Sequence, residues 1–343
     1  MVSIKDVAKR AKVSISTVSL AFNSPERVSE ATRERIYQAT KELKYTPASV
    51  VKKNAFQERK RKSVAVIMGS LVGPFWFEIL RGISETLTLN KMEMVLFSGN
   101  DSFEKHFMDL MRGGSCQGII LIIDGEGSEQ LLQIAADENF PVVMCCPPAG
   151  RFRFSSIMVD NWNIGQLAAN YFMQLGRRDI AVFGKCPRDC PDRAEGFLDA
   201  LKREKREVPK EWRILCDVTE EDAYRAAKTF IKENKKLPDA VFGINDETAI
   251  GVIEAFRDEG INVPEEVSVI GCDNISISRF VQPPLTTIEM PKFEVGILTV
   301  NMLLRRIAGM PPERVVLNGK LIIRESCCMK KSADSQLKEC EDK

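Results

Sequence analysis

The chain has 343 residues, 44% apolar and 28% charged, a composition typical of globular proteins and a length that allows more than one domain. No run of eighteen apolar residues predicts a membrane span. Polar residues stand at the N-terminus where a signal peptide would carry its apolar stretch, so we expect a cytoplasmic protein with free thiols. The single histidine, His106, excludes metal sites with several histidine ligands and disfavours a Ser-His-Asp hydrolase.

Charge is divided unevenly along the chain. The net charge is +1, but residues 1–62 hold 15 Lys and Arg against 6 Asp and Glu, which leaves 34 basic and 42 acidic side chains for the rest. A basic N-terminal module on an acidic body is typical of a nucleic-acid-binding domain joined to a second function. A solvated basic surface without a partner is the alternative.

Residues 1–46 predict a small unit of three helices. The first helix has its apolar face at Ile4, Val7, Ala8 and Ala11. After a turn of three residues, Ser14 is placed to cap the second helix. In that helix the inward residues are expected to be Val18 and Phe22, and the outward ones Ile15, Ser16, Ser19, Leu20 and Asn23. The third helix is expected to be capped by Ser29 and to bury Ile36, Ala39, Thr40 and Leu43. Two helices across a short turn form a helix-turn-helix, whose second helix enters the major groove of DNA.

These segments carry a family resemblance. Between Ile4 and Pro47, the stretches IKDVAKRAKVSISTVSLAFN, VSEATRERI and LKYTP resemble the start of lactose-repressor (LacI/GalR) family regulators. The resemblance implies contacts to base edges from Ile15, Ser16 and Leu20, further contacts from Ser19 and Asn23, and phosphate contacts from Ser3, Thr17 and Arg33. Phosphate contacts fix the register on DNA, whereas base contacts select the sequence.

Two departures from the family pattern bear on DNA recognition. Leu20 stands where the family usually has arginine; leucine can contact only apolar groups such as a thymine methyl, so we expect a different half-site. Loss of specific reading is the alternative. Residues 47–62 correspond to the family's hinge, in which Val51 and Asn54 replace the usual alanine and leucine wedge. Asparagine kinks DNA poorly, and the basic run at 59–62 either holds phosphates or is a solvated linker.

From residue 63 onward, short β-branched segments alternate with amphipathic helical segments. A helix is predicted at 75–89, and strands are predicted at 63–68, 93–99, 118–123, 141–146, 179–184, 239–244 and 267–272. This alternation predicts an α/β body with parallel sheets. Ligands of such sheets bind beyond the carboxyl ends of the strands.

The family resemblance extends to about residue 328, through GPFWFEILRGI, VDNWNIG, DRAEGF, INDETAIGVI, VPEEVSVIGCDN and PPLTTI. It implies a two-lobed effector domain similar to type I periplasmic binding proteins, with the ligand in the cleft between the lobes. The N-lobe is expected at about 63–160 and 291–320, and the C-lobe at about 161–290 and 321–328. The polar tail, 329–343, has one leucine rather than leucine heptads, which favours a dimer over a tetramer.

The candidate effector-binding residues follow predicted strands or open helices: Phe75, Trp76, Asp160, Arg193, Asn245 and Asp273. Arg193 holds the family's effector-contacting arginine position, where a guanidinium can bind hydroxyls or a carboxylate; a surface salt bridge is the alternative. Asn245 and Asp273 suit hydroxyl groups, although Asp273 and its neighbour Asn274 could instead form only a loop turn.

Three further residues near these strand ends have competing interpretations. Trp76 is preferred to Phe75 for stacking on a sugar ring, with at least one of the two expected in the core. Asp246 is expected to cap the next helix rather than to bind ligand. Asp160 either contacts the ligand or only holds the crossover.

The cysteines are expected to be structural. Cys186 and Cys190 have no further ligand pair nearby and do not indicate a zinc site. The consecutive pairs Cys145-Cys146 and Cys327-Cys328 are expected to be small buried hydrophobic residues, with a redox switch as the alternative.

Together these features predict a sequence-specific transcriptional repressor that binds a near-palindromic operator as a homodimer. Its operator affinity is expected to depend on a small-molecule effector, without a metal or cofactor. The favoured effector is a sugar or sugar derivative, with a nucleobase or a small acid as the alternatives. An enzyme on the same scaffold is disfavoured because no nucleophile–base pair or phosphate-binding loop is present. A stand-alone sugar-binding protein is disfavoured by the basic helix-turn-helix. Non-specific DNA binding remains an alternative within the class of regulators.

Overall fold

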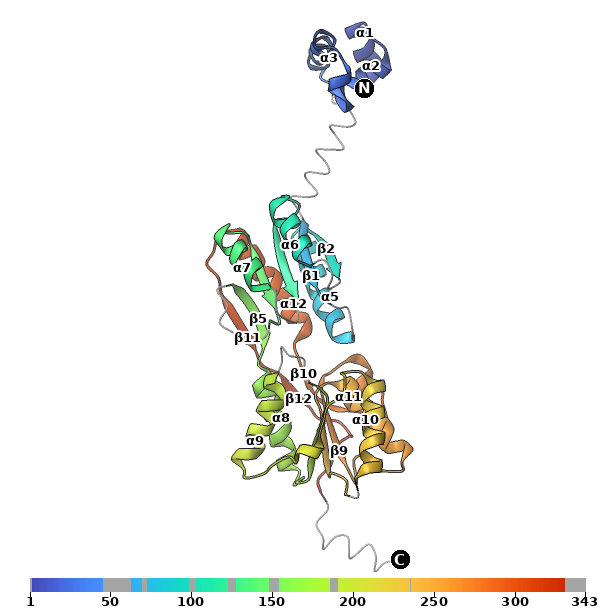
Figure 1. Ribbon diagram of the computed structural model, residues 1–343, viewed down its shortest axis with the longest axis vertical. Helices are drawn as coiled ribbons and strands as arrows, with labels where there is room; N and C mark the ends of the chain where they lie inside the picture. The colour runs from blue at the N-terminus through green and yellow to red at the C-terminus, as the bar shows by residue number, and fades with distance from the viewer. Residues whose placement is uncertain are drawn as a thin grey trace, which may run out of the picture.

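The computed structural model describes residues 2–45, 63–69, 73–98, 103–122, 128–147, 154–185, 191–234 and 236–330. These residues form an N-terminal helical domain and a body with two separate β-sheets (Figure 1). The expected hinge at 47–62, with Val51 and Asn54, lies outside the described residues, as does most of the tail. In the described part of the chain, no helix is both long and apolar enough to span a membrane.

Three helices and one short 3-10 turn build the N-terminal domain: α1 (Ile4–Ala11), α2 (Ile15–Asn23), η1 (Pro25–Arg27) and α3 (Glu30–Glu42). Their common core consists of Val7, Ala8, Ala11, Val18, Ala21, Val28, Ile36 and Ala39. The inner faces predicted for α1 and α3 are confirmed at their central positions, whereas in α2 the sequence pattern missed Ala21.

The predicted caps of the second and third helices have different outcomes. The Ser14 side chain accepts a hydrogen bond from the Thr17 N–H at 3.1 Å, which confirms the cap of α2. Ser29 holds the N-cap position of α3, but its hydroxyl donates to the Thr32 hydroxyl at 2.9 Å and caps no backbone N–H. The predicted side-chain cap at Ser29 is therefore wrong.

The first sheet of the body is parallel throughout and has the strand order β11-β5-β4-β3-β1-β2. Its strands are β1 (Ser63–Met68), β2 (Glu93–Ser98), β3 (Gly118–Ile122), β4 (Val142–Cys145), β5 (Ser155–Val159) and β11 (Arg314–Leu317). Its helices are α5 (Pro74–Leu89), α6 (Phe103–Arg112), α7 (Ser128–Asp137) and α12 (Lys292–Ile307). We call this part of the body the N-lobe.

The second sheet has the order β12-β10-β9-β8-β6-β7 and is parallel except for β12, which runs antiparallel to β10. Its strands are β6 (Ile180–Phe183), β7 (Arg213–Ile214), β8 (Ala240–Gly243), β9 (Ser268–Asp273), β10 (Thr286–Glu289) and β12 (Lys320–Ile322). Its helical segments are α8 (Asn161–Gln174), α9 (Pro191–Arg203), η2 (Lys210–Trp212), α10 (Glu220–Glu233), α11 (Asp246–Asp258) and η3 (Ser276–Arg279). We call this part the C-lobe.

The chain passes between the two sheets three times. It leaves the N-lobe after β5, returns between β10 and α12, and leaves again between β11 and β12. The two lobes are therefore joined by three strand ends, which lie where the lobes meet in Figure 1. All seven predicted strands are confirmed, whereas β5, β7, β10, β11 and β12 were not predicted.

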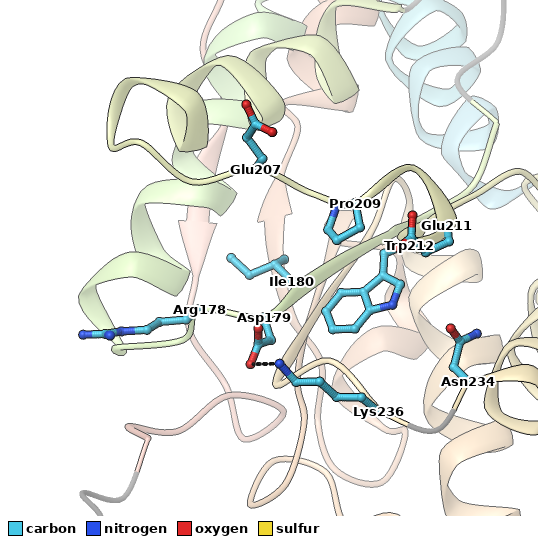
Figure 2. Close-up of a pocket in the computed structure, with 9 residues that line it drawn as sticks. All are labelled: Arg178, Asp179, Ile180, Glu207, Pro209, Glu211, Trp212, Asn234 and Lys236. Carbon is cyan, nitrogen blue, oxygen red and sulfur yellow. Dashed lines mark ion pairs between the residues drawn. The ribbon is translucent and has the colours of Figure 1, made fainter.

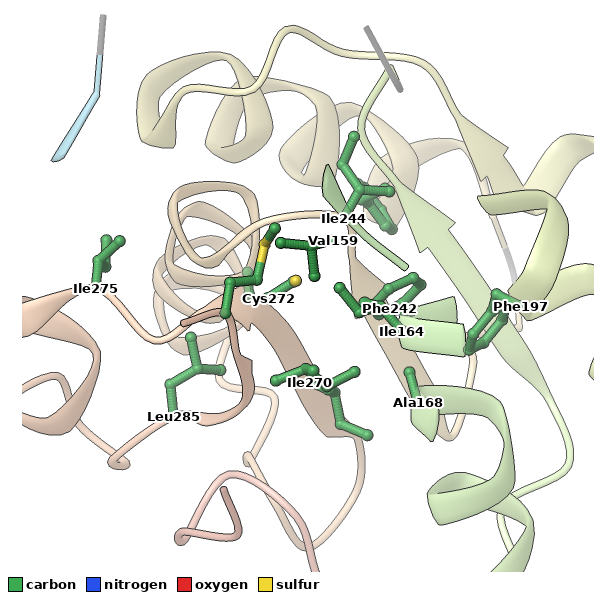
Figure 3. Packing of buried hydrophobic residues seen from close by; sticks show 14 of the residues in the cluster. Val159, Ile164, Ala168, Phe197, Phe242, Ile244, Ile270, Cys272, Ile275 and Leu285 are labelled. Atoms are coloured by element: carbon green, nitrogen blue, oxygen red, sulfur yellow. The ribbon is translucent and has the colours of Figure 1, made fainter. Parts of the chain in front are cut away.

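Buried aliphatic and aromatic side chains hold each layer. In the C-lobe, Phe197 of α9 stacks on Phe242 of β8 with 4.7 Å between ring centroids, beside Ile164 and Ala168 of α8 (Figure 3). In the N-lobe, all six residues of β1 are buried because helices cover both faces of the sheet. Continuous burial of this kind is typical of a parallel sheet.

Two glycines bring α8 and α9 into backbone contact. A Cβ on Gly165 would collide with the carbonyl oxygen of Arg193, and a Cβ on Gly196 would collide with that of Trp162. The absence of these side chains therefore lets α9 lie directly on α8, which places Arg193 beside the start of α8.

Candidate functional site

The first candidate surface is the exposed side of α2. Ile15 is 44% exposed at the start of this helix, and Ser16 and Asn23 are exposed as well. The Asn23 amide donates to the Ser19 hydroxyl at 3.2 Å. These side chains form a polar surface with one apolar residue, which suits the edges of bases in a major groove.

Leu20 departs from the predicted arrangement. Instead of facing outward, its side chain is half-buried and packs against the core of the N-terminal domain. A domain this small needs its apolar side chains for its own core. Part of the Leu20 side chain therefore packs in the domain core, and only the remaining exposed part is accessible to a base.

The three predicted phosphate contacts lie near the starts of helices. The backbone N–H and hydroxyl of Ser3 donate to the Asp6 carboxylate at 2.9 and 2.7 Å, and these bonds lower the pKa of Asp6. The Arg33 guanidinium donates to the Pro25 carbonyl at 3.3 Å. The Thr17 hydroxyl is hydrogen-bonded with that of Ser14 at 2.7 Å.

The second candidate site is centred on Arg193, whose side chain is only 12% exposed. Its guanidinium donates twice to the Asn161 side-chain oxygen, at 3.1 and 3.0 Å, and once to the Ile244 carbonyl. These partners come from α8 and from the end of β8. The alternative of a surface salt bridge is therefore wrong, because the guanidinium is buried where the strands end.

Asp273 is the acidic partner of this arginine. It ends β9 with a left-handed φ of 108° and a side chain 8% exposed. Its Oδ1 lies 3.7 Å from Arg193 Nη2 and has no hydrogen-bond partner among the described residues. Burial raises the pKa of Asp273, although Arg193 and then Lys292 act in the opposite direction. The site thus presents a buried acceptor next to a cation.

Asn245, and not the predicted Asp246, caps α11. Asn245 caps α11: its oxygen accepts the Thr248 N–H at 2.9 Å, and its amide donates to Glu247 and to the Val218 carbonyl. The predicted cap, Asp246, instead accepts the Ile275 N–H at 2.8 Å and the hydroxyl of Thr287.

The capping role of Asn245 has a physical reason and a consequence. Asparagine stands one residue earlier than the aspartate, at the position whose side chain reaches the third N–H of the helix. Both polar ends of the Asn245 amide are thereby bonded within the protein. Burial, and then the charge of Asp273, raise the pKa of Asp246 to about 8.

Sequence reasoning missed Glu247, whose side chain lies close to the N-lobe. Its side chain belongs to α11 of the C-lobe and is buried, yet its Oε1 lies 3.3 Å from the point where a Cβ on Gly73 would sit, at the start of α5 in the N-lobe. Burial and then Asp273 raise its pKa to about 7. A third polar residue directly after Asn245 and Asp246 was the available signal.

The remaining candidates lie around this cluster. Asp160 caps α8 by accepting the Asn163 N–H at 2.9 Å, which supports its role in holding the crossover. Phe75 and Trp76 open α5 in the N-lobe, where their rings meet edge to face at 4.9 Å and pack against the core. The structure thus gathers Arg193 and Asp273 in the C-lobe, with the aromatic pair in the other lobe.

A separate hollow of about 350 Å³ lies on the C-lobe (Figure 2). Figure 2 shows Trp212 at its wall and the ion pair of Lys236 with Asp179, whose atoms are 3.0 Å apart. The hollow lies at the amino end of β6, since Arg178, Asp179 and Ile180 line it. It contains none of the candidate effector residues, which lie at carboxyl ends of strands or at helix starts.

Comparison with known proteins finds matches for both parts of the chain. The sequence model of the bacterial regulatory proteins of the lacI family matches residues 3–48, and that of the periplasmic binding protein-like domain matches residues 169–327. The HTH-type transcriptional repressor PurR of Serratia proteamaculans is 33% identical over 334 residues, which is 95% of this chain and 97% of that protein.

Solved structures show the same architecture. A complex of the transcriptional regulator CelR with cellobiose has a TM-score of 0.70 at 26% identity, covering 95% of this chain and all of that one. The lac repressor dimer bound to operator and the anti-inducer ONPF has a TM-score of 0.73 at 23% identity, covering 95% and 99%.

A helix-turn-helix domain joined to a two-lobed α/β body defines a DNA-binding transcriptional regulator. The chain belongs to the lacI family of bacterial regulatory proteins. The predicted family and fold class are confirmed.

Proposed function

We propose that this regulator is a repressor that binds a near-palindromic operator as a homodimer, and that a small molecule between its lobes controls operator affinity. The observation that carries the proposal is the buried Arg193–Asp273 pair at the carboxyl ends of the C-lobe strands. It occurs in the same chain as an exposed reading helix. One part recognises DNA and the other a ligand.

A sugar or sugar derivative is the effector class that these groups favour. A hydroxyl group both donates and accepts, so it can satisfy the Asp273 Oδ1 while accepting from a guanidinium. Trp76 and Phe75 offer aromatic faces, which suit the apolar C–H face of a sugar ring. The CelR structure, with cellobiose bound, is a relative of this kind. Bound effector requires no metal or cofactor in this scheme.

Control of DNA affinity requires the effector to bind two lobe arrangements with different affinity. The side chain of Glu247 on α11 lies close to Gly73 at the start of α5. A movement of one lobe against the other would change the distance between these two residues. Coupling between two sites in one protein is ordinarily about 1–3 kcal/mol, or about 5- to 150-fold in affinity.

Homodimer formation is supported by exposed apolar residues on the N-lobe. The edge strand β2 exposes Val95 and Leu96, and α5 beside it exposes 60% of Phe77. An apolar edge strand left open is a site of pairing with another chain. A second copy related by a two-fold axis would place two reading helices on the two halves of an operator.

The proposal assigns no enzymatic activity to the protein and places it in the cytoplasm, where chromosomal DNA is. The test is a panel of neutral sugars, sugar phosphates and nucleobases, each titrated into the full chain bound to its operator. We expect at least one neutral sugar to change operator affinity about 5-fold or more. If no compound changes operator affinity and none raises the melting temperature of the body, the effector role of the cleft is wrong.

A further inference from the structure

Two pairs of consecutive cysteines lie in the body, and their thiols have different partners. Cys145 ends β4 and Cys146 follows it directly; both side chains pack in the same apolar cluster, where they interact with each other. In the other pair, the thiols donate to backbone carbonyl oxygens of two different segments, at 3.2 Å for Cys327 and 3.3 Å for Cys328. The sulfur atoms are thus paired with each other in the first case and separately engaged in the second.

The backbone fixes the geometry of the first pair. Cys146 has a left-handed φ of 52°, and its N–H donates to the Ile157 carbonyl of β5 at 2.8 Å. Cys145 is 1% exposed, whereas Cys146 is half-buried. The backbone of the second cysteine is therefore anchored to the neighbouring strand and its side chain is partly accessible to solvent, whereas the first cysteine is buried.

The surroundings also favour a reactive sulfur at this pair. The hydrogen bond from Cys146, and then Thr299, lower the pKa of Cys145 against the effect of burial. Burial instead raises the pKa of Cys116 and Cys216 to about 11 and that of Cys327 to about 12. Because the thiolate is the nucleophile and the metal ligand, Cys145 is the better candidate for chemistry than these three cysteines.

We propose that Cys145 and Cys146 form a dithiol site for a thiophilic group that bonds two sulfur atoms at once, with trivalent arsenic as the chemical type. With an organic arsine oxide, two S–As bonds form, and the oxygen leaves as water with the two thiol protons. No atom changes its oxidation state. The second bond is intramolecular, so a paired dithiol binds far more tightly than a single thiol.

The position of the pair gives the site its setting in the fold. It lies at the carboxyl end of β4, next to β5, the strand that leads into the crossover at Asp160. Ligands of parallel α/β sheets bind at this edge. A bound arsenic group would therefore lie on the N-lobe side of the region between the lobes. The inference depends on the two cysteines and is independent of the proposed effector.

The test uses phenylarsine oxide at one equivalent with the full-length, reduced chain, followed by intact mass and peptide mapping. We expect one phenylarsenic group per chain, with loss of one water, on the peptide that contains Cys145 and Cys146. A competing dithiol, 2,3-dimercaptopropanol, should remove it. Cys146→Ser should lose the adduct, whereas the matched variant Cys328→Ser in the other pair should keep it.

Other outcomes would overturn the inference. An adduct that maps to Cys327-Cys328, or to any other cysteines, would show that the reactive pair is elsewhere. An adduct that forms only after the chain is unfolded in denaturant would show that the folded pair is closed to ligands. Cys146 is half-buried, so its replacement by serine disturbs the core less than a replacement of the buried Cys145. Peptide mapping of the unmodified chain identifies the cysteines that carry the adduct without any variant.

Discussion

Replacing Arg193 by alanine should abolish the response to the effector and leave intrinsic operator recognition by the N-terminal domain unchanged. The guanidinium holds the Asn161 side chain and the Ile244 carbonyl and lies 3.7 Å from the Asp273 carboxylate. None of these contacts involves the helix-turn-helix. The two readouts, effector response and operator binding, therefore separate in this variant.

The size of the effect follows from burial. The substitution leaves Asp273, with 8% of its side chain exposed, without the guanidinium beside it. Removing one partner of a buried pair costs about 3–5 kcal/mol, because the remaining charge stays buried. We expect a loss of this size in the free energy of unfolding of the body. Effector affinity should fall about 100-fold or more, which corresponds to about 2.8 kcal/mol.

A double-mutant cycle makes the explanation testable. Asp273→Asn removes the charge, so the double variant should recover much of the stability that Arg193→Ala loses, yet remain blind to the effector. Urea denaturation of the four proteins and titration of effector into the operator complex are the assays. Arg203→Ala is the matched control on the same helix, since Arg203 is 65% exposed and should matter by less than about 1 kcal/mol.

Either of two results would show that Arg193 does not have this role. In the first, Arg193→Ala unfolds like the unmodified chain and keeps the effector response. In the second, the double variant is no more stable than Arg193→Ala, which would mean that an unpaired carboxylate is not the source of the loss.

Three further predictions concern packing, protons and the reading helix. Gly165→Ala should cost about 1–3 kcal/mol by overpacking and weaken effector binding by shifting Arg193, as urea denaturation and effector titration will show; an unchanged effector affinity would contradict the positioning role of this glycine. Folded-state pKa values raised to about 8 for Asp246 and about 7 for Glu247 mean that the folded chain holds protons which the unfolded chain has lost. Their stabilisation is complete below the unfolded pKa near 4 and is lost as pH rises to about 8. Urea midpoints should therefore fall from pH 5 to pH 8, less steeply in Glu247→Gln; the same slope in that variant would be contrary evidence. Ser14→Ala removes the cap of α2 and should destabilise the N-terminal domain by about 1 kcal/mol, seen as weaker operator binding, whereas unchanged binding would argue against the cap.

Periodicity predicted the helices of the N-terminal domain and seven strands of the body, whereas the division of the body into two lobes was implied by the family resemblance. The strands with long β-branched runs, such as β1 and β3, are buried on both faces, so their sequences are unambiguous. The strands that sequence reasoning missed are short or partly exposed. For example, β12 has three residues, and β10 reads Thr-Thr-Ile-Glu. These segments become strands because they pair with strands that are distant in the sequence, and a local sequence pattern carries no information about such pairing.

The sequence singled out several residues that the structure brings together, but it did not predict which contact each of them makes. Arg193 begins α9, the helix that follows β6, and Asp273 ends β9. The two residues come together because β6, β8 and β9 are neighbours in one parallel sheet, whose carboxyl ends lie at the same edge. Which residue caps α11 depends on where that helix begins, and the helix begins one residue earlier than the sequence pattern indicated, so that Asn245 and not Asp246 is the cap. Glu247 was missed because its contact crosses between lobes, and such a contact has no local signature.

The most direct test of the central claim is selection of binding sites from random duplex DNA with the purified full-length chain. We expect enrichment of a two-fold symmetric site, with half-sites about one helical turn apart. The half-site should change when Ser16, exposed on α2, is substituted. Uniform binding that is lost as salt rises, without any enriched sequence, would contradict sequence-specific repression and leave only electrostatic DNA binding.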